Sequence, residues 1–308
     1  MSRIATPLPF HLKLPTLIST RCGSSYVFAL LAGLPFSSAA QEWNKSSPPA
    51  TISSTTEEQT KPQVKLRLGI DYPLRTNENG DVGAGTQGEP AVSPTFQAEF
   101  RVEPVSYWFG SIAFYRYLYG DRQRPWNPDF TYTFGYDDWH PDTISLVYGN
   151  YAGNRLRPAS SETHAHFSEG TWSLGYKFRM PKALDPIFKA DEKHEVICIV
   201  NAHVTPRYTT LQDTSLQKYK RALSLGCRYM LPSNLYANLT VFYYPDHSQQ
   251  QPWDPDFTYS FGYFDWRPGT ISVQYNNYSG NRFAWRNGND GQGGFRAGSV
   301  SVFWSQSW

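Results

Sequence analysis

The fold is decided by a stretch that occurs twice in the chain. Residues 126–145 read WNPDFTYTFGYDDWHPDTIS, and residues 253–272 read WDPDFTYSFGYFDWRPGTIS. The match continues without a gap to residues 156 and 283, at a constant offset of 127, with 21 of 31 positions identical. This period is far longer than the roughly 20–50 residues of solenoid and propeller repeats. The sequence therefore predicts a duplicated half-domain, with copies at about 63–185 and 186–308.

The repeated stretch also shows the spacing of a β-strand. Phe130, Tyr132, Phe134 and Tyr136 alternate with small or polar residues, which is the period of two expected for a strand with two different faces. The same alternation recurs along the chain and predicts six strands in each copy. These strands are expected near residues 63–72, 95–103, 107–118, 128–138, 143–151, 170–180, 194–204, 219–230, 234–244, 255–265, 270–278 and 296–308.

Composition excludes several classes of protein. The 308 residues include 28 basic and 26 acidic side chains, 16% aromatic residues and only 3 cysteines. After residue 40 the chain has no apolar run of the roughly 18 residues that a membrane helix needs. The near balance of charge disfavours a nucleic-acid partner, and so few cysteines exclude a disulfide scaffold.

The N-terminal region is predicted to be a targeting segment rather than part of the fold. Residues 1–40 combine a basic start, an apolar run at 27–36 and small residues at 38–40, the pattern of a secretory signal peptide. An N-terminal anchor helix is the other interpretation, but the apolar run is too short for it. Residues 41–62 are rich in Ser, Thr, Pro and Glu and predict a disordered periplasmic tether, so the folded body is 63–308.

The lengths of the connections alternate between long and short. Residues 73–94 and 152–169 are long, whereas 103–106 and 140–142 are short, as in outer-membrane barrels. Backbone groups in hydrocarbon need partners, which an edgeless barrel provides. We therefore predict an all-β fold, a twelve-stranded antiparallel transmembrane β-barrel built from two six-stranded repeats. A secreted, soluble β-sandwich of two repeats is the alternative.

The last strand adds a resemblance. Val300, Val302, Trp304 and Trp308 alternate toward a terminal aromatic residue. This resembles the final-strand signal of Gram-negative outer-membrane β-barrel proteins, although Gln306 stands where an apolar residue is usual. The resemblance implies recognition by the barrel-assembly machinery, contact with outer-membrane lipid, and a location in the cell outer membrane.

The polar set of each strand is expected to face the lumen of the barrel. Twelve strands enclose less space than the sixteen of a general porin, and a narrow, basic lumen favours anions or acidic sugars. The other interpretation is that basic and acidic side chains pair across the bore and fill it. The predicted solute path consists of Lys65, Arg67, Glu99, Arg101, Tyr115, Lys177, Arg179 and Arg228.

A second candidate site lies at the predicted extracellular rim, where both copies carry the same residue types. A ring beside a planar donor suits a carbohydrate or carboxylate ligand. The preferred interpretation is structural, with an aromatic belt and an Arg–Asp pair that ties a loop to a strand. The rim residues are Trp126, Asp129, Asn154, Arg155, Trp253, Asp256, Asn281 and Arg282.

Signals for catalysis are weak. His164 and His166 lack further ligands at metal-binding spacing, no nucleophile motif is present, and we expect no metal, no cofactor and no catalytic residues, with a hydrolase kept as a third possibility. Cys198 and Cys227 fall on neighbouring strands in the lipid-facing register, where we expect two unpaired thiols rather than a disulfide.

These observations predict an outer-membrane channel for the export or uptake of a small anionic or sugar-like solute. The alternative is a non-conducting outer-membrane barrel whose extracellular loops bind a polysaccharide or a protein partner. Neither function involves nucleic acid.

Overall fold

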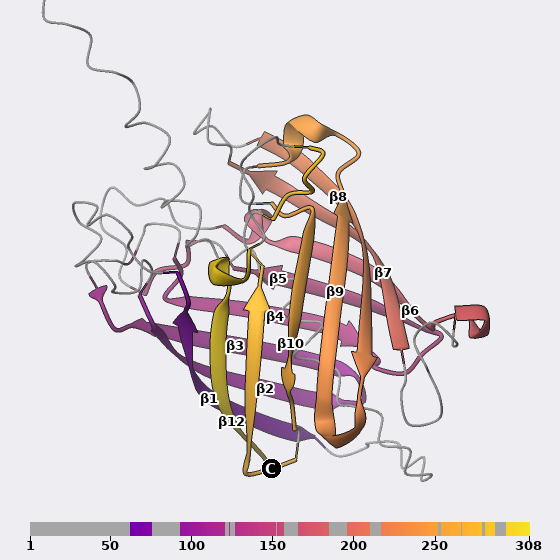
Figure 1. The fold of residues 1–308 in the computed structure, drawn as a ribbon. Coiled ribbons are helices and arrows are strands. Elements are labelled where there is room, and N and C mark those ends of the chain that lie inside the picture. Colours follow the sequence, from indigo (N-terminus) through magenta and orange to yellow (C-terminus); the bar gives the residue numbers. More distant parts are fainter. Residues whose placement is uncertain are drawn as a thin grey trace, which may run out of the picture.

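A computed structural model describes most of the predicted barrel (Figure 1). The predicted signal peptide and nearly all of the predicted tether lie outside the described residues. The structure describes residues 62–75, 93–120, 123, 127–151, 153–156, 166–184, 196–209, 217–251, 254–265, 267–278, 281–286 and 294–308.

The described chain forms twelve strands that close into a single antiparallel barrel. Each strand pairs with its neighbours in the sequence, and β12 pairs with β1 to complete the circle. The predicted fold class is therefore confirmed. The strands are β1 Gln63–Pro73, β2 Thr95–Val105, β3 Trp108–Tyr117, β4 Phe130–Asp137, β5 Thr143–Asn150, β6 Thr171–Arg179, β7 Val196–Tyr208, β8 Gln217–Met230, β9 Leu235–Tyr243, β10 Phe257–Tyr263, β11 Thr270–Asn277 and β12 Ser299–Ser307.

The first and last strands meet at the same end of the barrel. The amide of Val64 donates to the carbonyl of Trp308 at 3.1 Å, and the amide of Trp308 donates back to Val64 at 2.9 Å. We call this the turn end, because short connections such as residues 106–107 and 231–234 lie there. The opposite end, which carries longer connections such as 244–256, is the loop end.

The outer wall is apolar and exposed. Outward-facing Phe96, Ile144 and Ile271 are 51%, 61% and 57% exposed, whereas inward-facing Thr258 and Ser272 are 1% and 0% exposed. This is the reverse of a water-soluble protein and matches a wall that faces lipid. This surface includes a groove of about 570 Å³. The groove is lined mainly by apolar side chains, which include residues of β1, β2, β3, β11 and β12. Among the described residues, no helix has both the length and the apolar character needed to cross a membrane.

Two loops fold back onto the outside of the barrel in the same way. The hydroxyl of Tyr275 donates to the carbonyl of Phe295 in the short 3-10 helix η6 (Phe295–Ala297) at 2.7 Å, and their rings stack at 4.3 Å. The amide of Asn277 donates to Gly294 at 2.9 Å. In the first half, Tyr148 donates to the carbonyl of Phe167 in the 3-10 helix η2 (Phe167–Glu169) at 2.6 Å. We call each arrangement a loop latch; it gives outward-facing polar groups partners, which hydrocarbon cannot supply.

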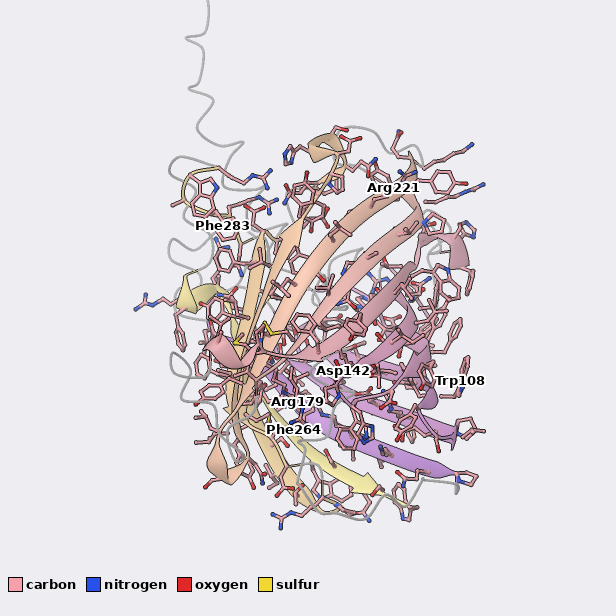
Figure 2. All side chains as sticks on the ribbon, turned by 90° about the vertical axis from the view of Figure 1, so that its right-hand side faces the viewer. Trp108, Asp142, Arg179, Arg221, Phe264 and Phe283 are labelled. Carbon is pink, nitrogen blue, oxygen red and sulfur yellow. A yellow bond between two sulfur atoms is a disulfide. The ribbon has the colours of Figure 1, made fainter. Side chains whose placement is uncertain are left out.

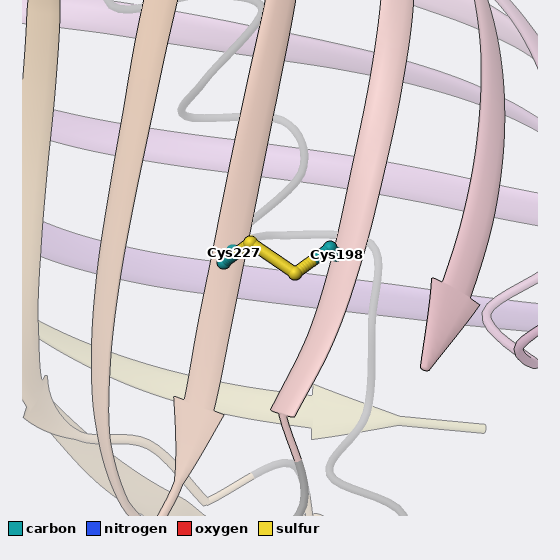
Figure 3. Close-up of a disulfide and its surroundings, with 2 residues drawn as sticks. All are labelled: Cys198 and Cys227. Atoms are coloured by element: carbon teal, nitrogen blue, oxygen red, sulfur yellow. A yellow bond between two sulfur atoms is a disulfide. The ribbon is translucent and has the colours of Figure 1, made fainter. Parts of the chain in front are cut away.

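A disulfide joins β7 to β8 and corrects the expectation of two free thiols. Cys198 and Cys227 lie directly opposite each other in the register, and their sulfurs are bonded (Figure 3). The lipid-facing placement on neighbouring strands was foreseen, but the facing register that permits the bond could not be read from the sequence. The pair links two segments 29 residues apart.

Candidate functional site

The inner wall carries the charged residues predicted for the solute path. Glu99, Lys177 and Arg228 occupy inward positions and are 7%, 0% and 4% exposed. Arg179 (labelled in Figure 2) ends β6 near the turn end and is exposed. The structure thus gathers most of the predicted residues on one inner surface and leaves Arg179 at its margin.

Arginines on this wall lie over aromatic rings. The guanidinium carbon of Arg101 is 3.8 Å from the centre of the Phe109 ring, and that of Arg228 is 5.0 Å from the Tyr236 ring. These two pairs occupy positions offset by 127, so the same contact occurs in both halves. Arg67, on β1, lies 3.6 Å from the ring of Phe303 on β12, across the closing seam. Cation–π contacts of this kind hold the charge in a fixed place.

Each ring lies opposite a glycine on the adjacent strand. Phe109 pairs with Gly135, and Tyr236 pairs with Gly262. At Gly262 the backbone has a φ of 157°, and a Cβ would overlap the carbonyl of Val273 on β11. At the closing seam Phe303 pairs with Gly69, where a Cβ would overlap the ring itself. Because glycine has no side chain, the backbone of the neighbouring strand or the aromatic ring can approach it closely. We call each set of arginine, ring and glycine an arginine–ring–glycine unit.

Two ion-pair clusters flank these units. Lys177, completely buried, pairs with Asp137 and also donates to the carbonyl of Asp138 at 2.7 Å. Lys65 and Arg101 share Glu103, at 3.0 and 2.7 Å. The short connection was predicted at 103–106, yet β2 continues to Val105 and Glu103 keeps the inward spacing of Glu99 and Arg101. That continued alternation was the signal that could have identified it.

Charged and aromatic side chains of several strands interact inside the bore. Arg67 interacts electrostatically with Glu99 on β2, with Tyr115 on β3, with Tyr236 on β9 and with Tyr278, which directly follows β11. Arg228 interacts electrostatically with the same two tyrosines. Tyr236 is only 2% exposed. The middle of the lumen is therefore narrow and largely filled by side chains, with Tyr115 bonded to Thr131 at 3.1 Å rather than extending freely.

At the loop end, the predicted rim residues bind other parts of the same chain. The carboxylate of Asp129 accepts hydrogen bonds from Gln123 at 2.7 Å, Arg155 at 3.2 Å and the amide of Leu156 at 3.1 Å. Burial raises the pKa of Asp129, but these hydrogen bonds outweigh it, and the pKa lies below its ordinary value. Asn154 donates to the Asn150 side chain at 3.1 Å.

The second half repeats this arrangement with a further arginine. Asp256 is completely buried and accepts from Gln250 at 2.8 Å and from Arg286 at 2.7 Å, while Arg282 lies 3.8 Å away. Asn281 donates to the carbonyl of Phe257 at 2.9 Å. The contacts tie the loops to the strands. The sequence analysis missed Gln123, Gln250 and Arg286, because nothing in their spacing marks them as partners of a distant aspartate. Trp126 and Trp253 lie outside the described residues.

The part of the chain that the structure describes shows no cluster of three or more His, Cys, Asp or Glu side chains placed to hold a metal ion. His164 lies outside the described residues, and His166 is used in a different way. Its backbone carbonyl accepts from Asn150 at 3.1 Å, within the first loop latch.

An edgeless barrel with an apolar outer wall and a polar, charged inner wall is an outer-membrane β-barrel in class. No protein-family model matches the chain, and no curated protein matches it in sequence. Among solved structures, an outer membrane channel from Pseudomonas putida F1 is similar with a TM-score of 0.40 and 10% identity, over 85% of this chain and 99% of that one. OmpF of Salmonella typhi, in a complex with daunomycin, has a TM-score of 0.33 and 9% identity, over 82% and 99%.

Proposed function

We propose that this protein resides in the outer membrane and is a narrow channel for a small anionic solute. The observation that carries the proposal is the fixed basic lining of the lumen, in which Arg67, Arg101 and Arg228 each lie over an aromatic ring. Positive charge held beside these rings lowers the barrier for an anion and raises it for a cation. An N-terminal signal peptide and the barrel-assembly machinery would deliver the chain to this membrane.

Passage requires the central side chains to move, because Tyr236 and Phe303 are each 2% exposed. Such a bore predicts small, intermittent conductance rather than the steady flow of a wide porin. The direction of transport depends on the gradient of the solute.

The filled centre also favours a second candidate function, a non-conducting barrel that binds a partner through its loops. Trp285 is 78% exposed and stacks on Phe283 at 4.3 Å, near the loop end. Exposed, stacked rings suit the faces of sugars. A polysaccharide is the ligand that this surface would accept.

Recordings in planar lipid bilayers distinguish the two functions. We expect conductance steps and a reversal potential that shows anion preference in a salt gradient. Replacing both Arg101 and Arg228 by alanine is expected to abolish that preference. Arg116→Ala is the matched control, because Arg116 is exposed on the outward face and its loss removes the same kind of charge from outside the bore. A purified barrel that opens no pores, together with binding of polysaccharide that Trp285→Ala removes, would establish the second function.

A further inference from the structure

The two halves of the lumen differ in how they treat the same arginine. Arg101 is neutralised by Glu103 at 2.7 Å, and Glu99, two positions before it on the same face, accepts from Ser111 at 2.9 Å. At the offset of 127, the positions of these two glutamates are occupied by Gly226 and Met230. The second half therefore keeps the arginine and loses both acidic side chains.

An asparagine replaces the serine at the equivalent position. Asn238 corresponds to Ser111, lies directly opposite Arg228 in the register of β8 and β9, and faces the lumen. It is 4% exposed, and neither its amide nitrogen nor its amide oxygen has a hydrogen-bond partner among the residues that the structure describes. A buried amide with both groups unsatisfied destabilises the fold unless something in the lumen binds it.

The charge beside this amide is basic. Arg228 lies directly opposite Asn238 in the register, and its guanidinium carbon is held 5.0 Å from the centre of the Tyr236 ring. A ligand here meets the guanidinium group of Arg228, which pairs with carboxylates in a planar geometry, and an amide that offers N–H donors and an oxygen acceptor. A simple anion satisfies only the donor. A hydroxyl group beside the carboxylate satisfies the acceptor as well.

We infer that the lumen holds a binding site for a small hydroxycarboxylate, built by Arg228 and Asn238. The inference deepens the proposed function and rests on it, because it identifies the solute class that the channel selects. The Arg228 guanidinium binds the carboxylate, the Asn238 amide nitrogen donates to it, and the Asn238 oxygen accepts from the hydroxyl. The first half, where Glu103 already occupies Arg101, positions side chains without taking a ligand.

The test measures thermal unfolding of the purified full-length barrel in detergent, by tryptophan fluorescence, against sodium lactate, acetate and chloride at equal ionic strength. We expect lactate to raise the midpoint with an apparent affinity about tenfold tighter than acetate, the factor that one added hydrogen bond supplies. Asn238→Ala is expected to make the two acids equal, and Arg228→Gln to remove the response to both. Ser111→Ala, the equivalent change in the first half, should keep the preference.

Equal responses to lactate and acetate in the unaltered protein would overturn the inference, as would a full response in a folded Arg228→Gln variant. Because Arg228→Gln could fail to fold, the ratio between the two acids in Asn238→Ala decides the question independently. The outcomes also separate the two proposals. Lactate binding without conductance in bilayers refutes the channel but leaves the site, and conductance without a lactate preference refutes the site but leaves the channel.

Discussion

Replacing Lys177 by methionine should strongly destabilise the barrel. Lys177 is completely buried, and the side chain of its partner Asp137 is 5% exposed. Methionine preserves most of the volume but leaves the carboxylate of Asp137 without its cation and the carbonyl of Asp138 without its donor at 2.7 Å. Removing one partner of a buried ion pair costs about 3–5 kcal/mol, because the remaining charge is uncompensated.

Two further variants show whether the unpaired carboxylate of Asp137 causes the loss of stability. Lys177→Met combined with Asp137→Asn removes both charges and should recover most of the loss, since replacing a whole buried pair is often close to neutral. Lys65→Met is the control, because the Lys65 side chain is 39% exposed and Glu103 keeps Arg101 at 2.7 Å. Because the Lys65 end of this pair is open to solvent, the pair is expected to contribute about 0–1 kcal/mol.

The assay is equilibrium unfolding by urea of the barrel in lipid vesicles, followed by tryptophan fluorescence and extrapolated to zero denaturant. A double-mutant cycle between positions 177 and 137 gives the coupling energy. The reasoning would be refuted if Lys177→Met lost less than about 1 kcal/mol, or if the double variant were as unstable as the single one.

Three further outcomes are expected. Gly262→Ala should destabilise the barrel by about 1–3 kcal/mol, because φ is 157° and a Cβ would meet the neighbouring strand. The control Gly110→Ala, where the space around the Cβ is open, should leave the stability unchanged. Urea unfolding of both variants measures the difference. Hydrogen bonds from Arg267 lower the pKa of Asp265 to about 2, so the contribution of Asp265 to the free energy of unfolding is complete above pH about 4 and is lost as the pH falls toward 2. In Arg267→Gln, the free energy of unfolding should depend less on pH over this range. An unchanged pH dependence would contradict the assignment. Both cysteines of the folded protein should resist maleimide labelling until a reductant is added, and labelling without reductant, detected by mass spectrometry, would show that the bond is absent.

The alternation of side chains made the strands predictable from the sequence. Phe130, Tyr132 and Phe134 on β4 follow a period of two, and a half-buried strand cannot slip by one residue without inverting its faces. The prediction placed this strand near 128–138, and β4 spans Phe130–Asp137. The inward direction of Arg101 and Arg228 followed from the same rule.

The remaining features depend on contacts between segments far apart in the chain. Which groups meet Arg67 across the bore depends on how the barrel closes, and a single strand does not encode its neighbours on the opposite wall. The buried Asn277 shows the same limit. Its outward register predicts contact with lipid, but the loop latch covers it through Gly294 at 2.9 Å. The meeting of side chains from different strands inside the bore and the return of the loops are three-dimensional outcomes, so periodicity along the sequence does not reveal them.

The covalent link between β7 and β8 restricts how the wall can open. Along their edges, neighbouring strands of a barrel are held by hydrogen bonds and side-chain contacts, and such a seam can part sideways to admit a new strand or to let a bound molecule leave into the bilayer. The bond between Cys198 and Cys227 removes that freedom at one seam. Lateral separation must therefore begin at another pair of strands, and β1 with β12, whose outermost contact is the reciprocal pairing of Val64 and Trp308, is a seam that no disulfide crosses among the described residues.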